Sequence, residues 1–178
     1  ELLGLRGLDF RGQAGDIDET MDPGKPPYDE VARVSRKKAD AVERGSDDVV
    51  IAADTIVVCG DRVLGKPKDE AQAKQMLSLL SGREHQVMTG MTVLRADRAV
   101  TVTEVTRIRF RELTEAEICA YVATGDPMDK AGAYGIQGGG ALFVTGMDGD
   151  YYNVMGLPVC RLTMILRQLG IPAGEGRQ

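Results

Sequence analysis

A run of apolar residues with one carboxylate at its centre is the feature of this sequence that most constrains its fold. The segment VVIAADTIVVC, residues 49–59, has the length and β-branched content of a buried strand. In an alternating strand Asp54 and Thr55 point to opposite faces. If both faces are covered, an unpaired carboxylate is costly and favours binding a proton, a cation or a metal. Asp54 is therefore either a structural acceptor of backbone N–H bonds or a functional group.

Helical and strand-like patterns alternate along the rest of the chain, and this alternation predicts an α/β fold. The 178 residues suffice for a single domain over 1–178, with two small lobes around a cleft as the alternative. The segment DGDYYNVMGLP is expected to be turn and loop. We expect four helices: over 28–45, from Asp69 to about 80, from the Thr114–Glu117 capping box to about 122, and over 158–169. We expect strands over 49–59, about 85–95 and about 99–111.

Composition excludes several classes of function. The net charge of −5, without any basic stretch, argues against nucleic acid as a partner. No apolar run approaches the roughly 18 residues of a membrane span, and no signal sequence is recognisable, so we expect a soluble intracellular protein. The three cysteines are scattered without CxxC pairing, which argues against a disulfide framework or a zinc site. A small anionic ligand stays compatible with a local group of cations and a divalent metal.

Two charged segments are candidates for binding a metal or an anion. The loop DIDET, residues 16–20, has three acids in four positions, which suits a hard divalent cation but also a solvated turn. Lys38 lies on the apolar stripe of the helix expected over 28–45, so its ammonium either extends to solvent or meets an anion. Lys66 stands between glycine and proline in GKP, which suits phosphate binding or a plain exposed turn.

A glycine-rich segment is a candidate for binding a base. In GIQGGG, residues 135–140, the glycines allow close approach of the backbone, and Gln137 offers both a donor and an acceptor. A flexible turn with a surface glutamine is the alternative. His85 is the only histidine, and no recognisable nucleophile motif lies near it, so we expect it to be structural.

Seven segments occur in an order that resembles a known family. They are DIDET, the KA of Lys38-Ala39, AADTIVV, LGKPKDEAQA, LSGREHQVMTG, YVATGDPMDKAGAYGIQG and YYNVMGLP. Between about residues 16 and 158 the sequence resembles the Maf family of nucleotide pyrophosphatases. The resemblance implies an α/β fold with a long mixed central sheet flanked by helices, similar to that of the inosine triphosphate pyrophosphatases. It also implies cleavage of nucleoside triphosphates between the α and β phosphates, a divalent cation (Mg²⁺ or Mn²⁺), a cytoplasmic location and a homodimer.

The resemblance also implies roles for individual residues in catalysis. Asp54 corresponds to the family's proton acceptor, and with Glu19 it is expected to hold the metal. Lys38 and Lys66 are expected to bind the triphosphate. An ionised, partly desolvated carboxylate that orients or deprotonates water is physically consistent with the role of Asp54.

The motifs ADT and YGIQG resemble the branch of the family that acts on dTTP and UTP, whereas the branch linked to 7-methyl-GTP resembles SDQ with a different loop. Thr55 and Gln137 are therefore the expected specificity residues. A second hypothesis is a nucleotide-binding regulator of septum formation or division arrest, in which binding is the output. A pyrophosphatase acting on another base is a third.

One difference from the family concerns the start of the sequence. Family members normally begin with a strand and an SxSPRR loop before ELL, and this sequence begins at that ELL, with Glu1. We expect a preceding segment to be missing. A protein with only these residues is expected to be weak or inactive, whereas a protein that carries the loop is expected to be active.

Overall fold

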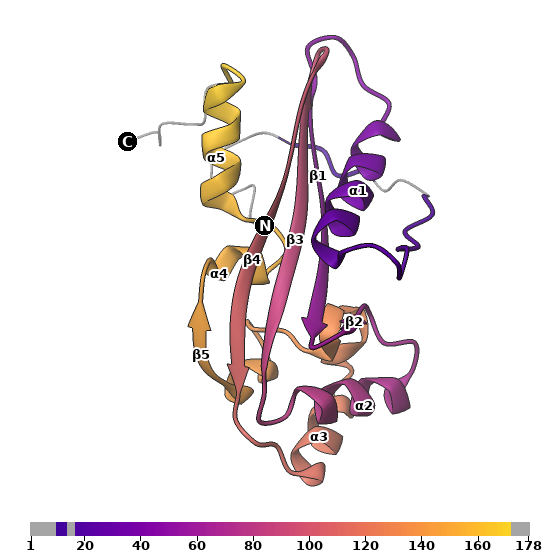
Figure 1. The fold of residues 1–178 in the computed structure, drawn as a ribbon, viewed down its shortest axis with the longest axis vertical. Coiled ribbons are helices and arrows are strands. Elements are labelled where there is room, and N and C mark those ends of the chain that lie inside the picture. Colours follow the sequence, from indigo (N-terminus) through magenta and orange to yellow (C-terminus); the bar gives the residue numbers. More distant parts are fainter. Residues whose placement is uncertain (1–9, 14–16, 172–178) are drawn as a thin grey trace. The chain divides into compact units, whose positions relative to one another are not determined.

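The computed structural model describes residues 10–13 and 17–171 (Figure 1). The chain divides into two compact units. Of the described residues, the first unit comprises 10–13, 17–54, 89–104 and 156–171, and the second comprises 55–88 and 105–155. No helix in the described part of the chain is long and apolar enough to cross a membrane.

A five-stranded antiparallel sheet lies at the centre of the fold, and its strand order is β2-β1-β3-β4-β5. The strands are β1 (Val49–Cys59), β2 (Arg62–Leu64), β3 (Glu84–Arg95), β4 (Arg98–Phe110) and β5 (Val144–Asp148). The α/β class is confirmed, but the prediction of a mixed sheet is corrected to an antiparallel one. Short turns at 60–61 and 96–97 join β1 to β2 and β3 to β4, whereas a parallel neighbour needs a long crossover connection.

In the first unit, helices cover both faces of the strands. Helix α5 (Val159–Gln168) packs on the face of β1 that carries Val49 and Ile51. Helix α1 (Pro27–Asp40) packs on the opposite face, against Val50 and Ala52 (Figure 1). The helix that was predicted over 28–45 ends earlier in the structure, at Asp40. Residues 43–48 are exposed, so no buried contact stabilises a further turn.

One glycine allows α1 to lie close to the sheet. A Cβ added to Gly90 of β3 would overlap the carbonyl oxygen of Val31 in α1. Beside this contact, the hydroxyl groups of Ser35 and Thr92 form a buried hydrogen bond of 2.9 Å. The backbone of β3 and one face of α1 are therefore in direct contact in the first unit.

In the second unit, helices α2 (Glu70–Leu80) and α3 (Glu115–Val122) pack with the strands around one apolar core. Both N-termini are capped as predicted, α2 by Asp69 and α3 by the capping box of Thr114 and Glu117. The segment expected to be turn and loop contains the short helix α4 (Tyr151–Val154). Three 3₁₀ turns connect the remaining parts: η2 (Asp126–Asp129), η3 (Ala131–Ala133) and η4 (Gly139–Phe143).

His85 lies in this core, as predicted for a structural residue. Its side chain is buried against Phe110 and Tyr134, and its Nε2 lies 2.8 Å from the Tyr134 hydroxyl. Burial lowers the pKa of His85 to about 4, so the ring is neutral at pH 7.

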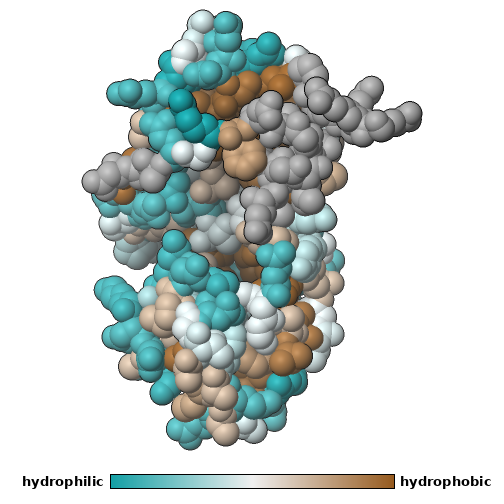
Figure 2. Space-filling view, turned by 180° about the vertical axis from the view of Figure 1, so that it is seen from behind, coloured by the Kyte–Doolittle hydropathy of each residue, from teal (hydrophilic) through white to brown (hydrophobic). Residues whose placement is uncertain are grey.

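In the view of Figure 2 the described residues form a mainly hydrophilic or neutral surface, with hydrophobic residues in small separate areas.

Candidate active site

Three predicted site residues of the first unit meet in one cluster, which we call the ion-pair cluster: Glu19, Lys38 and Asp54. The ammonium of Lys38 donates to Asp54 Oδ1 at 2.7 Å and lies 3.0 Å from Glu19 Oε1. The side chain of Asp54 is 11% exposed, whereas that of Glu19 is 55% exposed. One lysine thus joins a nearly buried carboxylate to a carboxylate at the surface.

The fold brings these residues together through two periodic patterns. Asp54 follows Val50 and Ala52 on the face of β1 that packs on α1. Lys38 lies on α1 one helical turn beyond Val34, which is fully buried. Because both patterns point to the same interface, the carboxylate and the ammonium meet there. Of the two alternatives for Lys38, the structure shows the one in which the ammonium meets an anion.

The ion pair with Lys38 offsets the free-energy cost of placing the carboxylate of Asp54 in a buried strand. Burial lowers the pKa of Lys38, but hydrogen bonds to Asp54 and Glu19 outweigh this effect, and the pKa lies above its usual value. The ammonium therefore stays charged at neutral pH. A positive charge at 2.7 Å compensates the charge on Asp54, which would otherwise be expensive in a site that is mostly buried.

The donor set of the cluster fits a hard divalent cation. Glu19 and Asp54 direct carboxylate oxygens at one positive charge, and Mg²⁺ is commonly held by one or two carboxylates together with water and substrate phosphates. Among the described residues, no three acidic, histidine or cysteine side chains gather closely enough to hold a metal by themselves. In the DIDET loop, Asp18 accepts the backbone N–H of Thr20 at 2.9 Å, and Asp16 lies outside the described residues.

The other predicted site residues, Thr55, Lys66 and Gln137, belong to the second unit. Thr55 follows Asp54 in β1, which continues without interruption, so the two side chains point to opposite faces of that strand. Lys66 is exposed after β2, and Gln137 is exposed in the glycine-rich segment. The structure brings Glu19, Lys38 and Asp54 together in one cluster, and the roles of all six predicted site residues stay predictions.

The glycine loop, residues 135–140, is held by side chains that the sequence motifs did not assign to a role. The N–H of Gly135 donates to the Tyr121 hydroxyl at 3.0 Å, and this hydroxyl donates to Asp126 Oδ2 at 2.7 Å. A Cβ added to Gly138 would lie 2.8 Å from the same Asp126 oxygen. The charged segment before the glycines, DPMDK, was the available sequence signal, but it did not reveal that Tyr121 joins it.

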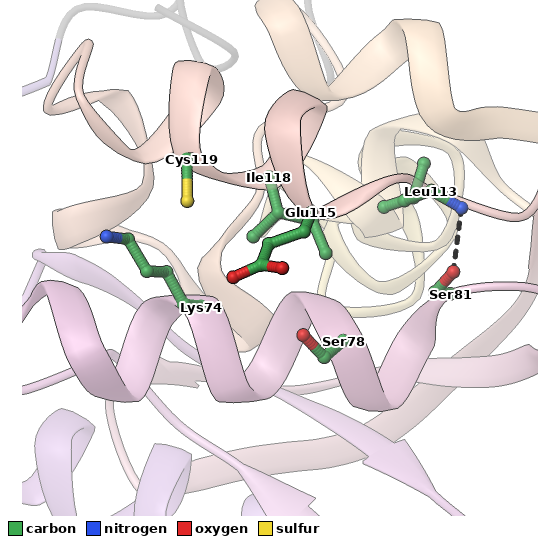
Figure 3. Close-up of a pocket in the computed structure, with 7 residues that line it drawn as sticks. All are labelled: Lys74, Ser78, Ser81, Leu113, Glu115, Ile118 and Cys119. Carbon is green, nitrogen blue, oxygen red and sulfur yellow. Dashed lines mark hydrogen bonds between the residues drawn. The ribbon is translucent and has the colours of Figure 1, made fainter.

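A separate groove of about 310 Å³ lies between α2 and α3 in the second unit (Figure 3). The Ser81 hydroxyl in its wall accepts the N–H of Leu113 at 2.7 Å. None of the predicted site residues lines this groove, which is bordered by Lys74, Ser78, Ser81, Leu113, Glu115, Ile118 and Cys119.

Fold and site together define an α/β protein in which a helix lysine neutralises a carboxylate in a central strand. The family model described as "Maf-like protein" matches residues 1–169, so this chain belongs to the Maf-like family and the resemblance of the motifs is confirmed. A dTTP/UTP pyrophosphatase of Bacillus cereus (strain AH820) is 49% identical over 172 residues, which cover 96% of this chain and 90% of that protein. A protein of Bacillus thuringiensis subsp. konkukian (strain 97-27) with the same name matches with the same identity and coverage.

Proposed function

We propose that this protein is a nucleoside triphosphate pyrophosphatase that hydrolyses dTTP and UTP to the monophosphate and pyrophosphate. The observation that carries the proposal is the ion-pair cluster, in which Lys38 holds Asp54 as a charged, nearly buried carboxylate. The relatives named dTTP/UTP pyrophosphatase support the choice of substrate, since they are 49% identical over almost the whole chain.

In the proposed mechanism Asp54 accepts the proton of the attacking water. The water oxygen forms a bond to the α phosphorus, the bond between that phosphorus and the bridging oxygen breaks, and pyrophosphate leaves with the electron pair. A carboxylate serves as base at neutral pH only while it is ionised, and the neighbouring ammonium of Lys38 favours the ionised form. Lys38 and Lys66 bind phosphate oxygens and stabilise charge on the leaving group.

A divalent cation, Mg²⁺ or Mn²⁺, is part of this proposal. Glu19 and Asp54 would hold it, and when bound it would neutralise phosphate charge. In the described structure the ammonium of Lys38 lies between these carboxylates, so the proposal includes movement of Lys38 towards the phosphates when metal and nucleotide bind.

For the base, we propose recognition by Thr55 and Gln137, whose hydroxyl and amide groups can pair with a pyrimidine edge. We further propose a cytoplasmic homodimer without nucleic-acid or membrane partners. The family resemblance supports the dimer and the location, and the net charge of −5 argues against nucleic acid.

The proposal is tested by incubating the full-length protein with a panel of nucleoside triphosphates and Mg²⁺ or Mn²⁺, and by measuring pyrophosphate release. We expect product mainly from dTTP and UTP, and only when a divalent cation is present. Equal turnover of purine triphosphates would overturn the substrate assignment. Nucleotide binding without product would instead support the regulatory hypothesis.

A further inference from the structure

Two residues of α1, the buried Glu30 and the partly exposed Arg33, form an ion pair beside the acidic loop, which here means residues 17–24. Arg33 donates from Nε to Glu30 Oε1 at 2.9 Å and from Nη2 to Glu30 Oε2 at 2.7 Å. The side chain of Glu30 is only 2% exposed. The hydrogen bonds from Arg33, and then that from the backbone of Asp22, lower the pKa of Glu30 to about 2. The pair is therefore fully charged at every pH at which an enzyme of this kind would work.

The same pair binds the backbone of the acidic loop at two points. The N–H of Asp22 donates to Glu30 Oε2 at 2.8 Å, and Arg33 Nη2 donates to the carbonyl oxygen of Thr20 at 2.8 Å. Thr20 directly follows Glu19, the loop residue that reaches Lys38. The backbone next to Glu19 is thus attached to α1, the helix that also carries Lys38.

Other contacts of the loop are weaker or local. The N–H of Thr20 donates to Asp18 and the N–H of Gly24 donates to Asp22, and both bonds join residues two apart, so they shape the turn without attaching it to the helix. The ion pair of Glu19 with Lys38 is more than half exposed on the glutamate side, and exposed pairs contribute little. A bidentate pair with a buried carboxylate is a stronger attachment.

We propose that Glu30 and Arg33 are positioning residues, which place the carboxylate of Glu19 beside Lys38 and Asp54. The consequence for turnover rests on the proposed function, whereas the attachment of the loop does not. Arginine is needed at 33 because only its planar fork binds Glu30 twice and still reaches the carbonyl of Thr20.

The attachment is tested by digestion of the full-length protein with a protease that cleaves after glutamate. In Arg33→Lys we expect the Glu19–Thr20 bond to be cleaved about tenfold faster than in the parent protein. Mass spectrometry of the products measures the rate. Glu30→Gln is a second variant with the same expectation. Arg36→Lys is the matched control, because Arg36 pairs with Asp40 on the same helix and the pair is exposed. Equal cleavage rates in Arg33→Lys, Glu30→Gln and Arg36→Lys would overturn the proposal.

The link to catalysis is tested by a double-mutant cycle on dTTP hydrolysis. We expect Arg33→Lys to lower kcat by about tenfold. When Glu19 is already Gln, Arg33→Lys should have no further effect, because it acts through Glu19. Losses that multiply in the double variant would show a general structural role and overturn the proposal. If the parent protein hydrolyses no nucleotide, the proposed function fails, and the digestion still decides the attachment.

Discussion

The ion-pair cluster of the first unit and the glycine loop of the second are built in opposite ways. The cluster consists of charges that compensate one another, with the ammonium of Lys38 at 2.7 Å from Asp54. The loop consists of backbone held by hydroxyl and carboxylate groups, Tyr121 and Asp126, with no room for a Cβ at Gly138. The cluster keeps charged side chains in place, whereas the contacts of the loop fix the conformation of its backbone.

This difference suggests how each region would fail. Removing a charge from the cluster changes the chemistry while most of the packing stays in place. Changing the exposed side chain of the loop leaves the charges in place and alters what the loop can recognise. We therefore expect the cluster to control the rate for every nucleotide and the loop to control the ratio between nucleotides.

The largest effect is expected for Asp54→Asn, which removes the proposed base and keeps the size of the side chain. Turnover should fall about 10³-fold for dTTP and UTP alike, measured as initial rates of pyrophosphate release. Asp40→Asn is the control, because Asp40 is an exposed acid of α1 paired with Arg36. Full turnover of Asp54→Asn would remove this carboxylate from the mechanism.

Gly90→Ala tests the packing behind the cluster. The added Cβ would overlap the carbonyl oxygen of Val31, so α1 has to move away from β3, and we expect a loss of about 3 kcal/mol in the free energy of unfolding. Urea unfolding measures it. In the control Gly12→Ala the new Cβ has nothing within 4 Å. A Gly90→Ala protein as stable as this control would show that the close approach of α1 is not needed.

His85 predicts a pH dependence of stability that belongs to the second unit. Its pKa is about 4 in the folded protein and 6.5 as the ordinary value, so between these limits the unfolded chain binds more protons and stability falls as pH falls. We expect the free energy of unfolding to fall by about 2 kcal/mol between pH 7.5 and pH 5. Urea unfolding at each pH measures this change.

The matched variant for this titration is His85→Gln, in which the loss between pH 7.5 and pH 5 should disappear even if the protein is less stable throughout. The assignment is clear because this is the only histidine, and the paired carboxylate of Glu30 titrates far below that range. A slope that persists in His85→Gln would assign the pH dependence to another group.

The smallest expected effect is that of Gln137→Ala on the preference for the base. We expect the ratio of kcat/KM for dTTP over dGTP to fall about tenfold, because one hydrogen-bonding side chain is lost. The rate for a poor substrate should change little. Gln75→Ala, at an exposed position of α2, is the control. An unchanged ratio would remove Gln137 from base recognition.

Much of the local structure could be predicted from the sequence. The strand over 49–59, the cap at Asp69 and the capping box of Thr114 with Glu117 agree with the structure, since each depends on residues adjacent in the chain. The end of α1 at Asp40 and the antiparallel pairing of β4 with β5 were not predicted, because both depend on contacts between segments that are distant in the chain.

The site was predicted in parts. Lys38 and Asp54 each stood out as a charged residue within an apolar pattern. Neither pattern shows which residue the charged side chain pairs with. Glu30 and Arg33 gave no such signal, because a glutamate three residues before an arginine is typical of a solvated helix face. Their bonds to the backbone of the acidic loop became evident only in the structure.

The sequence by itself therefore determined which residues are apolar, which helices are capped and which charges stand where apolar residues are expected, because these properties depend on side-chain chemistry and spacing along one chain. The tertiary structure decided that Lys38 compensates Asp54 and that Glu30 with Arg33 holds the loop beside Glu19. The reason is physical: a buried charge is stable only beside its partner, and the packing of α1 on β1 selects that partner.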